Sequence, residues 1–433
     1  METDLTIIST ERDLLSYLET QLELEFTGDR WFLIIENKII DFELTLPLSN
    51  SAKNALETVK LHPPIDEYSF KFNNCEFRQN LYIKERKRNS DERVTEELEK
   101  SKIEYEFNDC TFNNYEIRIG NTSKNITFIG EKKFTENLIL KNSDLKGKIR
   151  FRYCKFNKVD FKNTKFNDLA DFWNCIFQKK TIFYKTDFYG NAVFSSATFK
   201  ENVLFTYSLI EKVIIFRGTT FEKGLDLSTA IIAGTVSYFD VSLNYFDAER
   251  DKNKEQYEDF ISYDATIPVK NKRETYRILK NNYEKLSNNS ESLEIKELEM
   301  KTLLDEVNYK IFKEAKIRYL PNFILLQLNK FSNNYGNSYI RGAIFTVFTG
   351  AIIFYLSSIS TDKFYFTTSF NWDVFVEGTK YYWQFLLPTH RFDYMGKTIN
   401  FKYETLFYLS DFIGRIVVGY GIYQTIQAFR KYK

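Results

Sequence analysis

The segment NAVFSSATFKENVLF, at residues 191–205, contains phenylalanine at intervals of five and six residues. The same spacing continues on both sides of this segment, and Ile210 stands in for one phenylalanine. The phenylalanines in phase are Phe151, Phe156, Phe161, Phe166, Phe172, Phe177, Phe183, Phe188, Phe194, Phe199, Phe205, Phe216 and Phe221. This period fits neither an amphipathic helix nor an alternating strand. We therefore predict a solenoid in which each group of five residues forms one side of a coil and directs one phenylalanine inward.

The residue two positions before each phenylalanine should also face the interior, so it must be small. Alanine or threonine occupies this position at Thr164, Ala170, Thr181, Thr186, Ala192 and Ala197. The four cysteines, Cys75, Cys110, Cys154 and Cys175, each precede a phenylalanine by two residues in the same way. With no CxxC pair in the chain, we interpret them as small, reduced core residues and not as metal ligands.

Residues 191–205, together with FNNCEF at 72–77 and FNDCTF at 107–112, resemble the pentapeptide-repeat proteins. The resemblance covers roughly residues 70–246. It implies a right-handed quadrilateral β-helix, which we place at residues 69–248. Such a stack requires capped ends, because open strand edges pair with other chains. We expect residues 1–68 to form the N-terminal cap.

The phased phenylalanines stop after Phe246, and charged residues become frequent. Tyr276, Leu279, Tyr283 and Leu286 fall on one face of a predicted helix, and a second predicted helix begins near Glu291. We expect an α-helical hairpin and a juxtamembrane segment within residues 249–335. The strings RETYRILK and ELEMK in this region resemble the helical neck of membrane-anchored pentapeptide-repeat proteins.

The C-terminal region, residues 336–433, contains two long apolar segments. GAIFTVFTGAIIFYLSSI at residues 342–359 has no charged residue and, as a helix, would extend about 27 Å, close to the thickness of a bilayer core. We predict transmembrane helices at residues 341–360 and 406–429. Basic residues lie before the first helix and after the second, which predicts a two-pass protein of the inner, cytoplasmic membrane of a bacterium with both termini in the cytoplasm.

The second predicted span contains Asp411 and Arg415, which lie four residues apart on one helical face. Charges inside a bilayer are costly, so these two should pair, face protein or water, or lie near the interface. Both a functional role and a structural role remain open for them.

The loop YYWQFLLPTHRFDYMG, at residues 381–396, joins the two predicted spans. The order of span, short apolar helix, polar turn and span is that of a two-helix pore domain. In this interpretation the candidate pore residues are Trp383, Pro388, His390, Arg391 and Asp393. No TVGYG-like string is present, which excludes a potassium filter. The alternative is an interfacial turn anchored by aromatic residues.

The composition excludes several other classes of function. The formal net charge is +1, and residues 128–246 carry 18 Lys and Arg against 12 Asp and Glu, so the solenoid is not an acidic mimic of DNA. The charges are scattered, and we expect no nucleic-acid partner. With two histidines and no phosphate loop, nucleophile elbow or HExxH motif, we expect no enzyme activity, no cofactor and no metal site.

Two functions remain. The first is a membrane-tethered scaffold whose partners are the lipid bilayer and an unidentified cytoplasmic protein bound by the β-helix. The second is an oligomeric ion channel or pore-forming effector, used in stress or phage defence, with its pore loop at residues 381–396. The second function requires a homo-oligomer, whereas the first does not.

Overall fold

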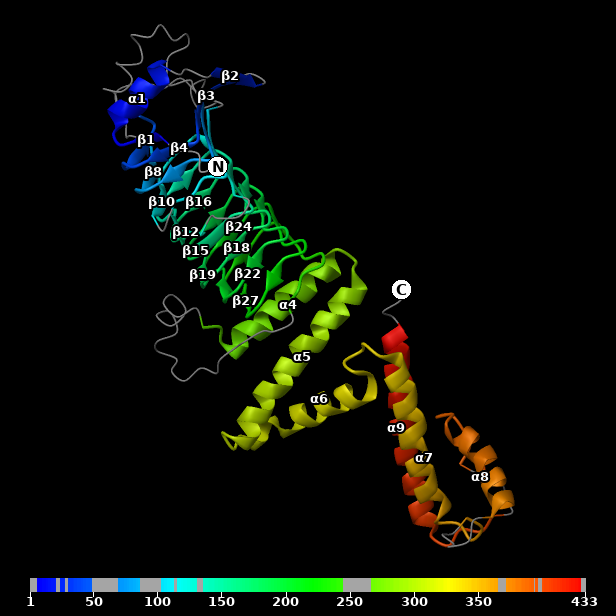
Figure 1. Ribbon diagram of the computed structural model, residues 1–433. Coiled ribbons are helices and arrows are strands. Elements are labelled where there is room, and N and C mark those ends of the chain that lie inside the picture. The colour runs from blue at the N-terminus through cyan, green and yellow to red at the C-terminus, as the bar shows by residue number, and fades with distance from the viewer. Residues whose placement is uncertain are drawn as a thin grey trace. The chain divides into compact units, whose positions relative to one another are not determined.

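The computed structural model describes residues 6–20, 24–27, 30–48, 69–85, 103–112, 115–130, 135–243, 266–364, 371–392, 394–395 and 399–429 (Figure 1). The chain divides into two compact units, Met1–Thr275 and Tyr276–Lys433. The first unit is built mainly of parallel strands and the second of helices.

The first unit is a stack of short strands, called here the solenoid, in which each strand pairs with one from the coil before and one from the coil after (Figure 1). The ten-stranded sheet contains β2 (Leu24–Thr27), β3 (Arg30–Glu36), β6 (Ser69–Asn73), β9 (Glu104–Asn108), β11 (Asn125–Ile129), β14 (Ile149–Arg152), β17 (Ala170–Asp171), β21 (Ala192–Val193), β25 (Val213–Ile215) and β29 (Thr235–Ser237). The eight-stranded sheet contains β5 (Leu44–Leu46), β8 (Leu81–Ile83), β10 (Glu116–Ile119), β12 (Thr135–Ile139), β15 (Lys155–Asp160), β18 (Ile176–Phe177), β22 (Thr198–Phe199) and β26 (Thr220–Phe221).

Three smaller sheets complete the solenoid. The five-stranded sheet contains β13 (Asp144–Leu145), β16 (Lys165–Phe166), β20 (Asp187–Phe188), β24 (Leu209–Ile210) and β28 (Ile231–Ile232). The three-stranded sheets contain β1 (Thr6–Ile8), β4 (Lys38–Ile40) and β7 (Glu76–Phe77), and β19 (Thr181–Ile182), β23 (Val203–Leu204) and β27 (Leu225–Asp226). Among the pairs between these strands, β2 with β3 is antiparallel and the others are parallel.

Phenylalanine rings fill the interior of the solenoid. All thirteen phased phenylalanines are at most 1% exposed, so the prediction that they face inward is confirmed. The rings stack on their equivalents in the next coil: the centroids of Phe172 and Phe194 are 5.1 Å apart, and those of Phe177 and Phe199 are 4.5 Å apart. The four cysteines are free and buried beside them, as predicted. The result is a parallel, β-helix-like stack around a continuous aromatic core.

The corners of the solenoid require special backbone conformations. Asn163, Asn174 and Ser196 adopt positive φ angles of 55°, 54° and 57°, a region that asparagine tolerates better than most residues. At Gly190 a Cβ atom would lie 2.1 Å from the carbonyl oxygen of Asp168 in the coil below. Only glycine allows the two backbones to approach this closely.

The solenoid begins before residue 69. Strand β3 pairs with β6, β4 with β7 and β5 with β8, all in parallel, so residues 30–46 form a coil of the same stack. Helix α1 (Glu11–Thr20) precedes this coil and buries Leu14, Leu15 and Leu18. Strands β1 and β2 also lie in this region, and residues 1–5, 21–23, 28–29 and 49–68 of the predicted cap lie outside the described residues.

Helix α4 (Val269–Lys285) follows the last described coil. The Asn271 side chain donates to Asp226 Oδ2 at 2.9 Å, and the Thr275 hydroxyl accepts from the backbone N–H of Leu227 at 3.0 Å. Both contacts are buried and satisfy polar groups of β27, the last strand of its sheet. The first turns of α4 therefore close that sheet against further pairing.

The second unit contains the rest of α4, α5 (Asn289–Phe312), the 3₁₀ turn η4 (Ile317–Tyr319), α6 (Leu320–Asn333), α7 (Tyr339–Ser358), α8 (Trp372–Phe385) and α9 (Glu404–Phe429). Helices α7 and α9 lie side by side along their length, with α8 beside them (Figure 1). Helices α7 and α9 are each long and apolar enough to cross a membrane, by length and composition. The predicted spans at 341–360 and 406–429 coincide with α7 and α9 to within two residues at each end.

Small side chains form the contact between α7 and α9. A Cβ on Gly421 would lie 2.3 Å from Thr346 Oγ1, and one on Gly342 would lie 2.7 Å from Thr425 Oγ1. Nearer the other end of the pair, the hydroxyls of Ser357 and Ser410 are 2.8 Å apart. Glycine, serine and threonine at these positions let the two helices approach closely.

Candidate functional site

A buried polar cluster joins α9 to the turn that follows α8. It consists of His390, Asp411 and Arg415, and its central residue, Asp411, is fully buried. His390 Nε2 is 2.6 Å from Asp411 Oδ1, and Arg415 Nε donates to Asp411 Oδ2 at 2.9 Å. Of the arrangements left open for Asp411 and Arg415, the structure contains the pairing, and it adds His390 as a second partner of Asp411.

The hydrogen-bond pattern restricts the protonation of this cluster. His390 Nδ1 lies 2.7 Å from the carbonyl oxygen of Leu387, which can only accept, so Nδ1 carries a hydrogen. The contact between His390 Nε2 and Asp411 then needs one more hydrogen, either on the ring as imidazolium or on the carboxyl as acid. One proton is thus held between His390 and Asp411.

The cluster lies among aromatic side chains. The ring of Tyr394 is 4.6 Å from that of His390, and the Arg415 guanidinium is 4.1 Å from the centre of the Phe392 ring. The Tyr394 hydroxyl and Arg415 Nη2 are buried without a hydrogen-bond partner. Burial raises the pKa of Tyr394, so its hydroxyl stays neutral.

The other candidate residues are not part of this cluster. Trp383 lies on α8 and is 61% exposed, and Arg391 is also exposed. Pro388 is half-buried in the turn after α8. Asp393 lies outside the described residues. Of the four candidate pore residues that the structure describes, only His390 contacts Asp411.

The sequence pattern did not identify Phe385 as a residue that holds this turn against α9. The ring of Phe385 is fully buried, and its nearest atom would lie 2.2 Å from a Cβ on Gly414. Gly414 therefore provides the space in which the end of α8 packs. The signal was present in the sequence, since Gly414 follows Asp411 by about one turn on the buried face of α9.

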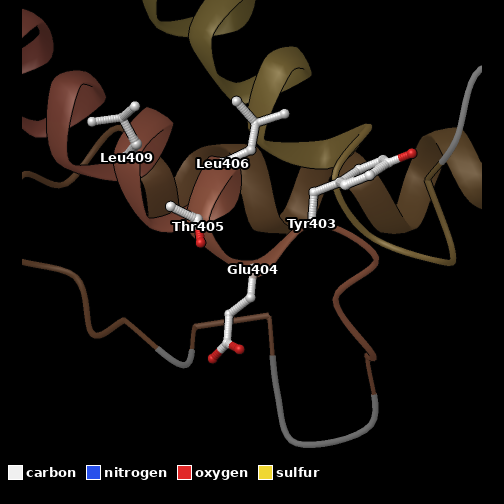
Figure 2. Close-up of a pocket in the computed structure, with 5 residues that line it drawn as sticks. All are labelled: Tyr403, Glu404, Thr405, Leu406 and Leu409. Atoms are coloured by element: carbon white, nitrogen blue, oxygen red, sulfur yellow. The ribbon is translucent and has the colours of Figure 1, made fainter.

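A shallow hollow at the start of α9 is lined by Tyr403, Glu404, Thr405, Leu406 and Leu409 (Figure 2). Glu404 points to the opposite side from Leu406, and none of the candidate residues lines this hollow. Within the described ranges, no group of histidine, cysteine and acidic residues is arranged to hold a metal ion.

The stacked phenylalanines and the parallel pairing from coil to coil define the first unit as a β-solenoid-like protein. The family comparison agrees, because residues 140–187 and 183–231 match the family of pentapeptide repeats. The chain therefore contains pentapeptide repeats at residues 140–231. No curated protein and no solved structure matches it.

Proposed function

We propose that this protein is an integral membrane protein in which α7 and α9 cross the bilayer and anchor a right-handed quadrilateral β-helix in the cytoplasm. The observation that carries the proposal is the distribution of side chains on the two helices. Small and polar residues are buried between them, whereas large apolar residues face outward, including Ile344, Phe348 and Ile352 on α7. In a water-soluble helix pair, the large apolar residues would be buried and the polar residues exposed. Lipid tails, in contrast, solvate an outward-facing apolar surface.

The outward apolar surface is extensive. The exposed large residues on α9 are Leu406, Tyr408, Leu409, Phe412, Ile413, Ile416, Tyr423, Ile426 and Phe429. A contiguous apolar surface of this kind marks contact with a membrane or with other chains. The flanking Lys330 and Arg341 support a cytoplasmic position for the N-terminal end of α7.

Membrane insertion is tested by fractionation and labelling. The full chain should stay with the membranes after washing at high pH, since a peripheral protein would be released. Because all four natural cysteines are buried, a single added cysteine reports its own side of the membrane. An impermeant maleimide should reach Lys363→Cys from outside the cell, and should reach Lys313→Cys only after the membrane is opened. Equal labelling of both sites in intact cells would refute the two-pass arrangement.

We further propose that the β-helix is a scaffold for a cytoplasmic protein. Its outer surface presents the side chains that dominate protein interfaces, namely Trp, Tyr and Arg. Tyr153 and Trp173 contact each other with centroids 4.8 Å apart, and the Arg152 guanidinium lies 5.9 Å from the Trp173 ring. Arg152 is held in place by a 2.9 Å ion pair with Asp171. This edge is a rigid aromatic and basic surface.

A photo-crosslinking residue at Trp173 should capture one discrete protein in intact cells. The matched control is Lys165, which is exposed on β16, in a different sheet from β17 and β18, the strands on either side of Trp173. Capture of the same proteins at both positions, or at neither, would argue against a binding surface at Trp173.

The buried cluster favours a second candidate function, an oligomeric channel. Ionisable residues within membrane segments commonly line ion paths, and Asp411 and Arg415 lie on a proposed span. The chain order of α7, α8, polar turn and α9 is also that of a pore domain. Conductance across planar bilayers that disappears with Asp411→Asn, from a symmetric oligomer, would support this function. A monomeric, non-conducting protein would support the scaffold alone.

A further inference from the structure

A shallow groove runs between the end of α6 and the first half of α7. It is lined by Phe331 of α6 and by Arg341, Ile344, Phe345, Phe348 and Thr349 of α7. Five of the six residues present mainly carbon, and the sixth carries a permanent positive charge. No acidic side chain lines the groove. The lining therefore suits a ligand with an anionic head and an apolar body.

Helix α6 is held in a fixed position beside α9. Asn333 Nδ2 donates to the carbonyl oxygen of Gln424 at 3.1 Å, and the Tyr420 hydroxyl donates to Asn329 Oδ1 at 2.9 Å. These contacts lie near the C-terminal end of α9, where the ring of Tyr339, at the start of α7, stacks on Phe429 with centroids 4.7 Å apart. The groove is thus at the end of the helix pair where basic residues are concentrated.

The face of α6 that points away from these contacts with α9 is apolar and exposed. Its exposed large residues are Leu320, Ile324, Leu325, Leu328 and Phe331, and α6 runs across the direction of α7 and α9 (Figure 1). An amphipathic helix in this orientation lies in the headgroup region of a bilayer with its apolar face toward the acyl chains. Lys330 on α6 and Arg341 on α7 then lie at the level of the lipid phosphates.

We infer that this groove binds one anionic glycerophospholipid, an inference that rests on the proposed insertion of α7 and α9. The Arg341 guanidinium binds the headgroup phosphate, for which its paired N–H donors are well suited. The acyl chain lies along Ile344 and Phe348. Basic pockets between membrane helices on the cytoplasmic side are known to hold anionic lipid headgroups, and the charge of the groove selects such a lipid over a zwitterionic one.

The test uses the full chain, reconstituted in nanodiscs that contain phosphatidylcholine and phosphatidylglycerol. Native mass spectrometry counts the lipids that stay bound after release into detergent. The wild type should retain one phosphatidylglycerol in preference to phosphatidylcholine. Arg341→Gln should weaken this retention about fivefold, the effect expected for one basic residue at an anionic surface.

Two further variants distinguish lipid binding in the groove from a general attraction of anionic lipid to positive charge. Lys402→Gln removes an exposed charge at the opposite end of the helix pair, where the Lys402 N–H donates to Ser360 O at 2.9 Å, and should leave retention unchanged. Ile344→Trp fills the groove while keeping Arg341, and should reduce retention as Arg341→Gln does. Circular dichroism checks that each variant keeps its helices.

The outcomes distinguish the site from the membrane proposal. Equal retention by the wild type and Arg341→Gln, or equal losses in Arg341→Gln and Lys402→Gln, would overturn the lipid site while leaving insertion intact. A chain that does not enter nanodiscs, and that high pH releases from membranes, would overturn the proposed function and the lipid site with it.

Discussion

At the scale of single residues, the solenoid depends on rings that touch from coil to coil. Phe194 is fully buried, and its ring lies 5.1 Å from Phe172 and 5.5 Å from Phe216 at interplanar angles of 5° and 18°. Each such ring removes a large apolar area from water and adds an offset-stacked contact on both sides. The position two residues before it must be small, because the same interior holds both side chains.

Phe194→Ala should lower the free energy of unfolding of the solenoid by about 3–5 kcal/mol, since it leaves a cavity between two coils that cannot collapse together. Denaturant unfolding followed by circular dichroism measures this loss. The matched control is Phe239→Ala, at a ring that is 67% exposed, where the change should be below about 1 kcal/mol. Similar losses at both positions would contradict the inward-facing ladder.

Asp411 is the residue on which the polar cluster of the second unit depends. Asp411→Asn should destabilise the helical unit in detergent by about 3 kcal/mol, because Arg415 and His390 would lose the carboxylate they share in a buried site. Thermal unfolding by intrinsic fluorescence reports the change. Asp362→Asn, at an exposed position between α7 and α8, is the control and should be neutral. Full stability of Asp411→Asn would show that the cluster is not structural.

At the scale of elements, α7 and α9 pack together through the complementary shape of their facing surfaces. The buried residues of α7 are glycine, serine and threonine, whereas those of α9 include Ser410, Gly414 and Gly421 beside larger residues such as Phe407 and Val418. The small residues let the backbones approach, and the hydroxyls of Ser357 and Ser410 meet. The solenoid uses the opposite rule, since its strands are held by large interior residues. Each rule fits the solvent proposed for that element, lipid in one case and water in the other.

Gly421→Ala should weaken the packing of α7 on α9 by about 1–3 kcal/mol, because the added Cβ would come within 2.3 Å of Thr346 Oγ1. Gly419→Ala adds the same methyl group to the same helix, where the nearest atom is Pro388 Cγ at 4.0 Å. Gly419→Ala should therefore leave the stability of the helix pair nearly unchanged. Thermal stability of the two variants in detergent gives the comparison, and a reversed order would mean that the two helices pack through a different face.

At the scale of the whole molecule, the chain combines two units with different cores. The buried cysteines all lie in the first unit, so their reactivity reports on the folding of that unit alone. Burial raises the pKa of Cys154 well above the ordinary value of a thiol, so this residue stays neutral in the folded solenoid. Because the pKa of this thiol is higher in the folded state than in the unfolded state, its burial adds to the free energy of unfolding at pH values below the ordinary thiol pKa. This contribution to stability is lost as the pH rises above that value.

Iodoacetamide should therefore not label Cys154 in the native protein at pH 8, and labelling should begin when the solenoid unfolds. The urea midpoint of the solenoid should fall between pH 8 and pH 10 in the wild type and fall less in Cys154→Ala. Mass spectrometry of the alkylated peptide and unfolding curves at both pH values provide the measurements. Rapid alkylation of the folded chain would contradict a sealed core.

Much of the architecture was predictable because its signals are local. The five- and six-residue spacing of phenylalanine specifies which side chain faces inward without reference to any distant residue. The helix predicted from the spacing of Tyr276, Leu279, Tyr283 and Leu286 corresponds to part of α4. The short apolar helix expected within residues 381–396 overlaps the end of α8. The first turns of α8 were not predicted, although Trp372, Phe375 and Val376 fall at helical spacing.

The sequence by itself determined the coil period, the interior rings, the reduced cysteines and the two long apolar helices, because each follows from residues close together in the chain. Only the tertiary structure decided that β3, β4 and β5 join the stack and that His390 meets Asp411 across 21 residues of chain. These contacts join segments that are far apart in the sequence, and their free energy depends on the complementary shape of both partners. No pattern of neighbouring residues in the sequence predicts that complementarity.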